Sequence, residues 1–168
     1  AGNSLTINPA DTTITCTQTN TRKSAQLTLV KTWAANSIAG NTTTVTSSGF
    51  DNSASSGLST ATVVGNTTTG SAVTVYAGES GTISETFGVG SAANYDAVLS
   101  CTGNATALVG STLTVDPADT SITCTETNTR KGATLTLVKT WAANSIAGNT
   151  TTVTNSGFIN NASSGLST

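Results

Sequence analysis

The sequence contains no histidine and no methionine, only two prolines, and 4% aromatic residues. The missing histidine excludes Ser-His-Asp and Cys-His catalysis and most zinc sites. A formal net charge of −2 with no basic run argues against a nucleic-acid partner. No stretch approaches the roughly 18 apolar residues of a membrane-spanning helix. We therefore expect no enzyme, no cofactor, no metal site and no membrane span in this sequence.

Charge is also scarce, because charged residues make up 8% of the chain against roughly 25% in ordinary globular domains. Threonine, serine, asparagine, glycine and alanine take their place. The apolar residues nonetheless alternate with polar ones, as at Leu27 and Leu29 and at Val73 and Val75. Such alternation predicts half-buried strands, and β-branched threonine suits their exposed faces. The pattern predicts an all-β fold.

The chain repeats itself. Residues 4–60 return, nearly unchanged, as residues 112–168, with no insertion or deletion and an offset of 108 residues. A fixed period of this kind indicates an array, and a unit of about 108 residues has the size of a small domain. We therefore expect tandem domains rather than one catalytic unit.

Domain boundaries are expected at the turn-rich segment Thr-Asn-Thr-Arg-Lys, residues 19–23 and again 127–131. Residues 1–23 are then the end of a preceding copy, residues 24–131 a complete copy, and residues 132–168 the start of a following one. Because methionine is also absent, we expect the chain to be a window onto a longer polypeptide. The basic end of the segment fits a solvated linker, with a binding site as the alternative.

Gly- and Asn-rich turns divide the complete copy into short runs. Short strands with turns every 8–12 residues indicate an Ig-like β-sandwich. A core of this size with few aromatics needs covalent reinforcement. We expect strands near residues 26–33, 42–47, 60–65, 71–77, 81–87, 95–101, 112–116 and 121–128.

Cysteine supplies one such reinforcement. Cys101 and Cys124 lie in one copy, and Cys16 is the repeat equivalent of Cys124. We predict a Cys101–Cys124 disulfide, with the partner of Cys16 outside this sequence; two reduced buried thiols are the alternative. A disulfide implies an oxidising compartment, so we expect an extracellular or cell-surface location.

Three polar residues fall on strand faces that otherwise point inward. A lysine between core residues is costly unless it is neutral or paired. Side chains two residues apart share a strand face. The three are Lys31 between Leu29 and Trp33, Glu85 between Ile83 and Phe87, and Asn128 on the face of Ile122 and Cys124.

These motifs resemble the prealbumin-like, Cna protein B-type domains of bacterial pilins and repetitive surface adhesins. The similar features are a first-strand L-x-L-x-K, a T-I-S-E-T followed by Tyr95, and a closing C-T-E-T-N-T. The resemblance implies a prealbumin-like β-sandwich in which Lys31 and Asn128 form an isopeptide bond with Glu85 as the catalyst. Residues 88–95 depart from the Pro-x-Gly-Tyr often found there. The alternative is a buried Lys31–Glu85 ion pair with Asn128 only hydrogen-bonded.

Other polar residues are weaker candidates. Glu126 is matched by Gln18 in the preceding copy, so a carboxylate is not needed at every such position. The Pro-Ala-Asp motifs ending at Asp11 and Asp119, with Asp116 nearby, fit side-chain-capped turns, with calcium as the alternative. N-glycosylation sequons occur at Asn41, Asn66, Asn104, Asn149 and Asn161.

These observations together favour a structural repeat module, forming the stalk of a long surface adhesin or the body of an extracellular filament. Its expected partners are neighbouring repeats and host or surface ligands. The alternative is a module that binds carbohydrate or ice through Thr-rich strand faces such as residues 13–19.

Overall fold

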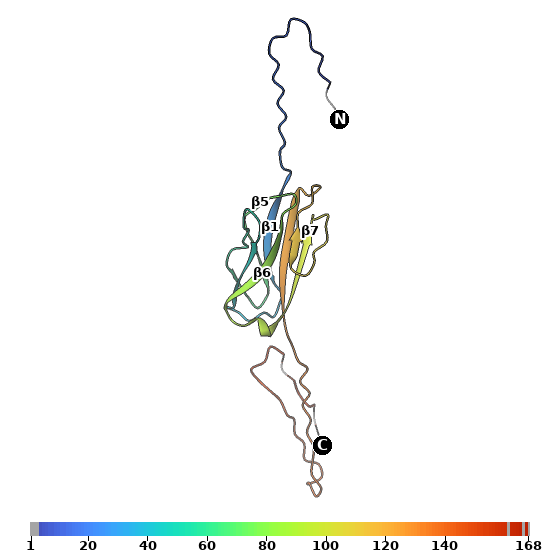
Figure 1. Ribbon diagram of the computed structural model, residues 1–168. Helices are drawn as coiled ribbons and strands as arrows, with labels where there is room; N and C mark the ends of the chain where they lie inside the picture. The colour runs from blue at the N-terminus through green and yellow to red at the C-terminus, as the bar shows by residue number, and fades with distance from the viewer. Residues whose placement is uncertain (1–3, 161, 166, 168) are drawn as a thin grey trace.

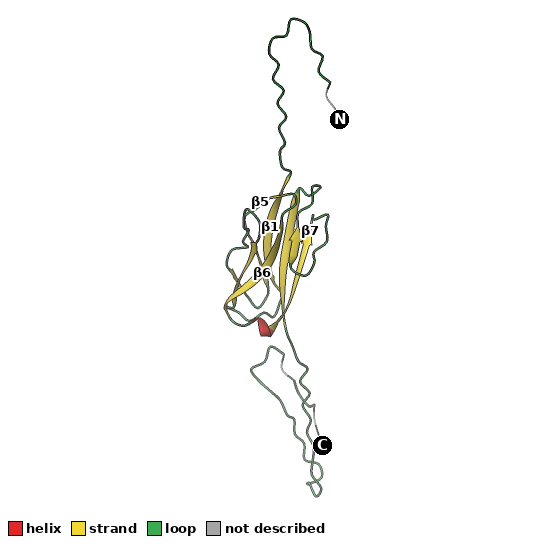
Figure 2. Ribbon diagram, viewed as in Figure 1, coloured by secondary structure: helices red, strands yellow, loops and turns green. Residues whose placement is uncertain are grey.

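The computed structural model describes residues 4–160, 162–165 and 167 (Figure 1). Two facing β-sheets occupy the middle of the chain, and the segments before and after them leave from opposite ends (Figures 1 and 2). No helix in the described part of the chain is long and apolar enough to cross a membrane. The strands are β1 (Ser24–Trp33), β2 (Thr42–Ser48), β3 (Ser59–Thr60), β4 (Asn66–Thr69), β5 (Val73–Tyr76), β6 (Ser80–Val89), β7 (Tyr95–Thr102), β8 (Thr112–Thr114) and β9 (Ser121–Arg130), with the 3-10 helix η1 (Ala92–Asn94) before β7.

The larger of the two sheets is built around the first and last strands, β1 and β9. One sheet has the order β4-β1-β9-β7, with β5 also paired to β1, and the other has the order β3-β2-β6-β8. β1 and β9 are parallel, whereas the other strand pairs are antiparallel. The all-β, two-sheet prediction is therefore confirmed for residues 24–130.

The core between the sheets has two apolar clusters. Alternation along the strands places most of the leucine, isoleucine and valine in the larger cluster, which also holds Phe50, and three aromatic residues in or against the smaller one. Burial of this apolar surface is the main favourable term for such a small fold. The larger cluster includes Leu27, Leu29, Val45, Val75, Ile83, Leu113, Val115, Ile122 and Cys124, and the smaller is Trp33, Ala61 and Tyr95 with Ile38 and Phe87 packed against it.

The expected strand near 60–65 is wrong. β3 ends at Thr60, and the apolar pair Val63 and Val64 lies in an exposed turn closed by Gly65 at φ 82°. The run Asn66–Thr69, which looks like a polar loop, instead forms β4 against the edge of β1. Threonine is well suited to a half-exposed strand at a sheet edge. The two valines are apolar but exposed, so hydrophobicity alone did not predict where they lie.

The predicted disulfide is present. Cys101 on β7 and Cys124 on β9 lie directly opposite each other in the antiparallel pair, with their Cα atoms 4.0 Å apart. The bond therefore ties an edge strand to the central strand β9. Cys16 is exposed and has no partner within the described residues.

Replacing Cys101 and Cys124 by alanine should lower the free energy of unfolding by about 3 kcal/mol, because the unfolded chain regains the freedom of the closed loop. Urea denaturation of the oxidised wild type and the double variant measures the difference. Cys16→Ala is the matched control and should leave the midpoint unchanged. Equal midpoints for the wild type and the double variant would show that the disulfide adds no stability.

Candidate functional site

A polar layer separates the two apolar clusters. Lys31 and Asn128 have no exposed surface, and the side chain of Glu85 is 10% exposed. Alternation places Lys31 between the two clusters on β1, and Glu85 holds the corresponding place on β6 in the facing sheet. Asn128 comes from β9, the parallel neighbour of β1. Three strands therefore position the three predicted residues.

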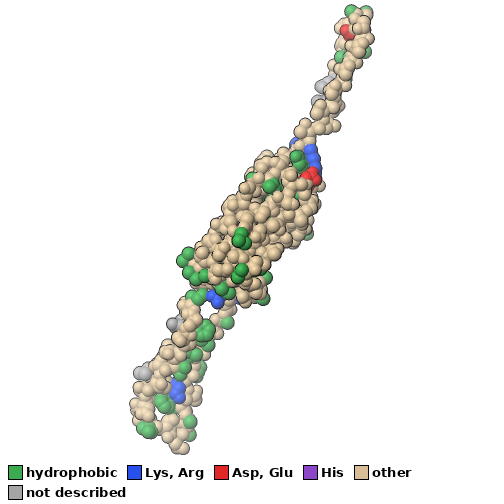
Figure 3. Space-filling view, turned by 90° about the vertical axis from the view of Figure 1, so that its left-hand side faces the viewer, with side chains coloured by type: hydrophobic (Ala, Val, Ile, Leu, Met, Phe, Trp, Pro, Cys, Tyr) green, Lys and Arg blue, Asp and Glu red, His purple; other side chains and the backbone are tan. Residues whose placement is uncertain are grey.

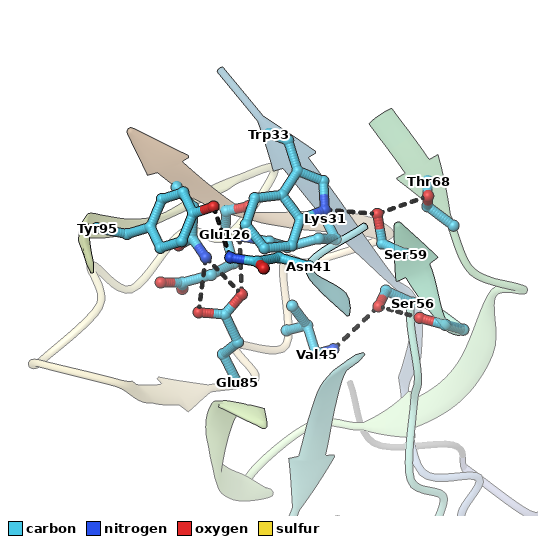
Figure 4. A network of polar contacts seen from close by, with 12 residues as sticks. Lys31, Trp33, Asn41, Val45, Ser56, Ser59, Thr68, Glu85, Tyr95 and Glu126 are labelled. Carbon is cyan, nitrogen blue, oxygen red and sulfur yellow. Dashed lines mark hydrogen bonds and ion pairs between the residues drawn. The ribbon is translucent and has the colours of Figure 1, made fainter. Parts of the chain in front are cut away.

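The three side chains meet at the Glu85 carboxylate. Lys31 Nζ lies 2.8 Å from Glu85 Oε1, and Asn128 Nδ2 donates to both Glu85 oxygens at 2.9 and 3.1 Å. Lys31 Nζ also donates to the backbone carbonyl of Glu126 at 3.4 Å. Figure 4 shows Glu85 pointing toward the group formed by Lys31, Trp33 and Tyr95. The structure thus brings the Lys31 amine and the Asn128 carboxamide into contact with one carboxyl group.

The carboxamide of Asn128 is satisfied on one side only. Its Nδ2 faces Glu85, whereas its Oδ1 is buried without a hydrogen-bond partner among the described residues. A half-turn of the amide exchanges the two atoms. Oδ1 can then accept a hydrogen bond only if Glu85 carries a proton. The two orientations of Asn128 therefore match two protonation states of the Lys31–Glu85 pair.

Aromatic rings enclose this contact. The Trp33 ring centroid lies 5.2 Å from that of Tyr95 and 6.0 Å from that of Phe87. Lys31 Nζ lies 4.8 Å from the centre of the Trp33 ring. The rings place apolar surface beside the Lys31 amine, which keeps the local dielectric low and strengthens the contacts with Glu85.

Polar tips hold these rings in place. Trp33 Nε1 donates to Ser59 Oγ at 3.1 Å, and Tyr95 Oη accepts from Asn41 Nδ2 at 2.9 Å and from the backbone of Ile38 at 3.0 Å (Figure 4). Asn41 is one of the five sequons, and its amide is buried and already engaged. A glycan on Asn41 is therefore incompatible with the folded site.

Burial also sets the protonation balance. It lowers the pKa of Lys31 below the ordinary value, because desolvation disfavours the ammonium form and Glu85 only partly restores it. It raises the pKa of Glu126, and the nearby Glu85 carboxylate adds to this shift while Lys31 opposes it. A neutral amine at Lys31 is the form that can act as a nucleophile.

Glu126 is the residue that sequence reasoning undervalued. It is 9% exposed, faces inward on β9 and pairs in register with Lys31. Its place two residues before Asn128 on the same strand face was a signal available in the sequence. The glutamine at the equivalent position, Gln18, obscured that signal, because it suggested that the carboxylate of Glu126 has no specific role.

The remaining candidates lie outside the polar layer. Asp119 accepts from the backbone of Ala105 at 2.7 Å and of Asp116 at 2.8 Å, as expected for a capped turn. Asp11 makes the equivalent bond to the backbone of Asn8. No group of three or more potential metal ligands occurs within the described residues. Of the sequons, Asn66 and Asn104 are half-buried, Asn149 is exposed, and Asn161 lies outside the described residues.

No protein-family model, characterised protein or solved structure matches this chain. An amine of lowered pKa, a carboxyl group and a carboxamide in dry contact are the components of an amide-forming reaction.

Glu126→Gln should stabilise the protein increasingly as pH rises. The raised pKa means that the folded state holds the Glu126 proton more tightly than the unfolded state does. The stability from this carboxyl group is present below its ordinary pKa of 4.5 and is lost as pH rises through the raised value. Glutamine does not titrate, and Gln18 occupies the equivalent position. Melting temperatures at about pH 4 and about pH 7.5 measure the effect; a difference that is independent of pH would contradict it.

Proposed function

We propose that this chain is a structural module of an extracellular bacterial surface protein, in which tandem β-sandwich domains of about 108 residues form a stalk or filament. The near-identical repeats, the disulfide and the resemblance to adhesin and pilin domains support this function. Local structure also recurs with the repeat. The bridge Thr46–Ser55 returns as Thr154–Ser163, and the hydrogen bond from Trp33 to Ser59 returns from Trp141.

The observation that carries the proposal is the contact of Lys31 and Asn128 with one Glu85 carboxylate. Lys31 lies near the end of the first strand and Asn128 near the end of the last. An isopeptide bond between them would join the two strands through which the chain enters and leaves the sandwich. Such a bond reinforces a fold that has few aromatic residues and little charge.

The bond would form by a single self-modification. Proton transfer from Lys31 to Glu85 along their 2.8 Å contact gives a free amine and a carboxylic acid. With the Asn128 amide turned by a half-turn so that Oδ1 faces Glu85, the amine attacks Cγ of Asn128 while the acid donates to Oδ1. A proton then passes from the attacking nitrogen to Nδ2, the Cγ–Nδ2 bond breaks and ammonia leaves. As the Cγ–Oδ1 carbonyl re-forms, Oδ1 returns its proton to Glu85. Glu85 ends protonated, so atoms and charge balance. Each chain reacts once, which distinguishes this step from enzyme turnover.

The strand arrangement gives the bond a mechanical role. β1 and β9 are adjacent and parallel, and the flanking segments leave at opposite ends of the sandwich (Figure 1). Tension along the chain therefore pulls β1 and β9 past each other. A covalent bond between Lys31 and Asn128 would carry that tension. The chain between these two residues would then bear none of it.

A binding module remains the second candidate, because the outer face of the larger sheet is rich in threonine. In register across β4, β1 and β9, Thr67 lies beside Thr32 and Thr32 beside Thr127, and the hydroxyls of Thr32 and Thr67 are 3.2 Å apart. Ice or carbohydrate recognition would need this array to be flat, whereas sheets twist. A thermal-hysteresis or glycan-array assay on this chain separates the two candidates.

The intact mass of the reduced chain tests the proposed bond. The wild type should be lighter than its sequence by one ammonia. Lys31→Arg, Glu85→Gln and Asn128→Ala should each show the full mass of their own sequences, because each removes one component of the reaction.

Lys139→Arg is the matched control. Lys139 occupies the repeat position of Lys31 but has no acidic partner within the described residues, so this variant should still lose ammonia. A wild-type chain that is folded by circular dichroism but has its full sequence mass would show that the proposed bond does not form. It would leave Lys31 and Glu85 as a buried ion pair.

A further inference from the structure

The junction between the first segment and the sandwich holds a second polar cluster. Arg22, which precedes β1, places Nη1 3.2 Å from Asp51 Oδ2 and 3.4 Å from Glu79 Oε1. Its Nε donates to the backbone carbonyl of Ala77 at 3.2 Å, and its guanidinium lies 5.0 Å from the centre of the Tyr76 ring. In Figure 3, basic and acidic side chains meet where the first segment joins the sandwich.

The buried side chain of Glu79 distinguishes this cluster from a surface ion pair. It is 8% exposed, and its Oε2 accepts from the backbone of Tyr76 at 3.1 Å. Its Oε1 is buried and has no hydrogen-bond partner among the described residues. A buried carboxylate oxygen left in this state is costly unless a cation faces it. Arg22 supplies that cation.

The repeat identifies the source of the arginine. Arg22 is equivalent to Arg130, the last residue of β9, so it belongs to the final strand segment of the preceding copy. A backbone hydrogen bond adds to these contacts, because the amide of Ala77 donates to the carbonyl of Lys23 at 2.9 Å. A residue of one copy is thus bound by side chains and a backbone carbonyl of the next.

We propose that Glu79, Asp51, Tyr76 and the carbonyl of Ala77 form a docking site for the arginine that ends the preceding repeat. The site fixes the direction in which consecutive repeats join, so that the array bends less at this junction. This inference rests on the proposed function only in taking the repeats as consecutive domains of one polypeptide. It does not depend on the isopeptide bond.

The sequence also indicates that junctions differ in strength. Phe50 and Asn52 return as Phe158 and Asn160, but Asp51 is replaced by Ile159. The following copy therefore lacks one carboxylate of the docking site.

Backbone relaxation of the ¹⁵N-labelled full chain tests the docking site. In the wild type, residues 19–22 should have order parameters near the rigid value of about 0.85, and Arg22→Ala should lower them below about 0.6. Raising the salt concentration should lower the wild-type order parameters part of the way toward those of Arg22→Ala, because the Arg22–Asp51 pair is exposed and is screened by salt. Unchanged amide shifts in β1 and β9 show that the variant is folded.

Two further variants complete the test. Asp51→Ile reproduces the following copy and should give intermediate order parameters. Arg130→Ala is the matched control and should leave residues 19–22 unchanged. Equal order parameters in the wild type and in Arg22→Ala would overturn the docking site, and an unchanged Asp51→Ile variant would overturn the graded junction. Either result can occur with the ammonia loss intact, so failure here is distinguishable from failure of the crosslink.

Discussion

The amine of Lys31 has no access to water, and the middle of the sandwich is arranged around that constraint. An unpaired charge buried there would cost several kcal/mol. Glu85 must therefore face Lys31 from the opposite sheet at 2.8 Å, and Asn128 must occupy the other side of the carboxylate. The aromatic rings close the layer and keep its dielectric low. Without the polar layer the two apolar clusters would merge into a simpler core, so its presence calls for a chemical explanation.

The proposed bond between Lys31 and Asn128 would explain the polar layer, and the strand topology is consistent with it. The parallel pairing of β1 and β9 brings the first and last strands side by side, which is also what a link in a chain under tension requires. The disulfide ties β7 to the same central strand β9. Arg22, just before β1, contacts the carboxylates of Asp51 and Glu79. The disulfide, the Lys31–Glu85 pair and the Arg22 cluster thus each involve β1, β9 or the segment that enters β1.

Period-two alternation was enough to predict the inward faces of β1, β6 and β9, and hence the candidate residues Lys31, Glu85 and Asn128. It failed where burial depends on tertiary position. Two apolar valines after β3 are exposed in a turn, and the polar run Asn66–Thr69 became a strand because an edge of β1 was available to it. The contacts of Arg22 with Asp51 and Glu79 were also not predicted from the sequence. Nothing in a solvated-looking linker indicates that Glu79 presents a buried, unsatisfied oxygen to it.

Stretching single chains from their two ends tests the central claim most directly. With Lys31 bonded to Asn128, force cannot extend the residues between them, so the wild type should show no unfolding step. Glu85→Gln should release a length on the order of 300 Å, since the disulfide still holds residues 101–124. A wild-type step of the same length would contradict the claim that the strand pair is covalently closed.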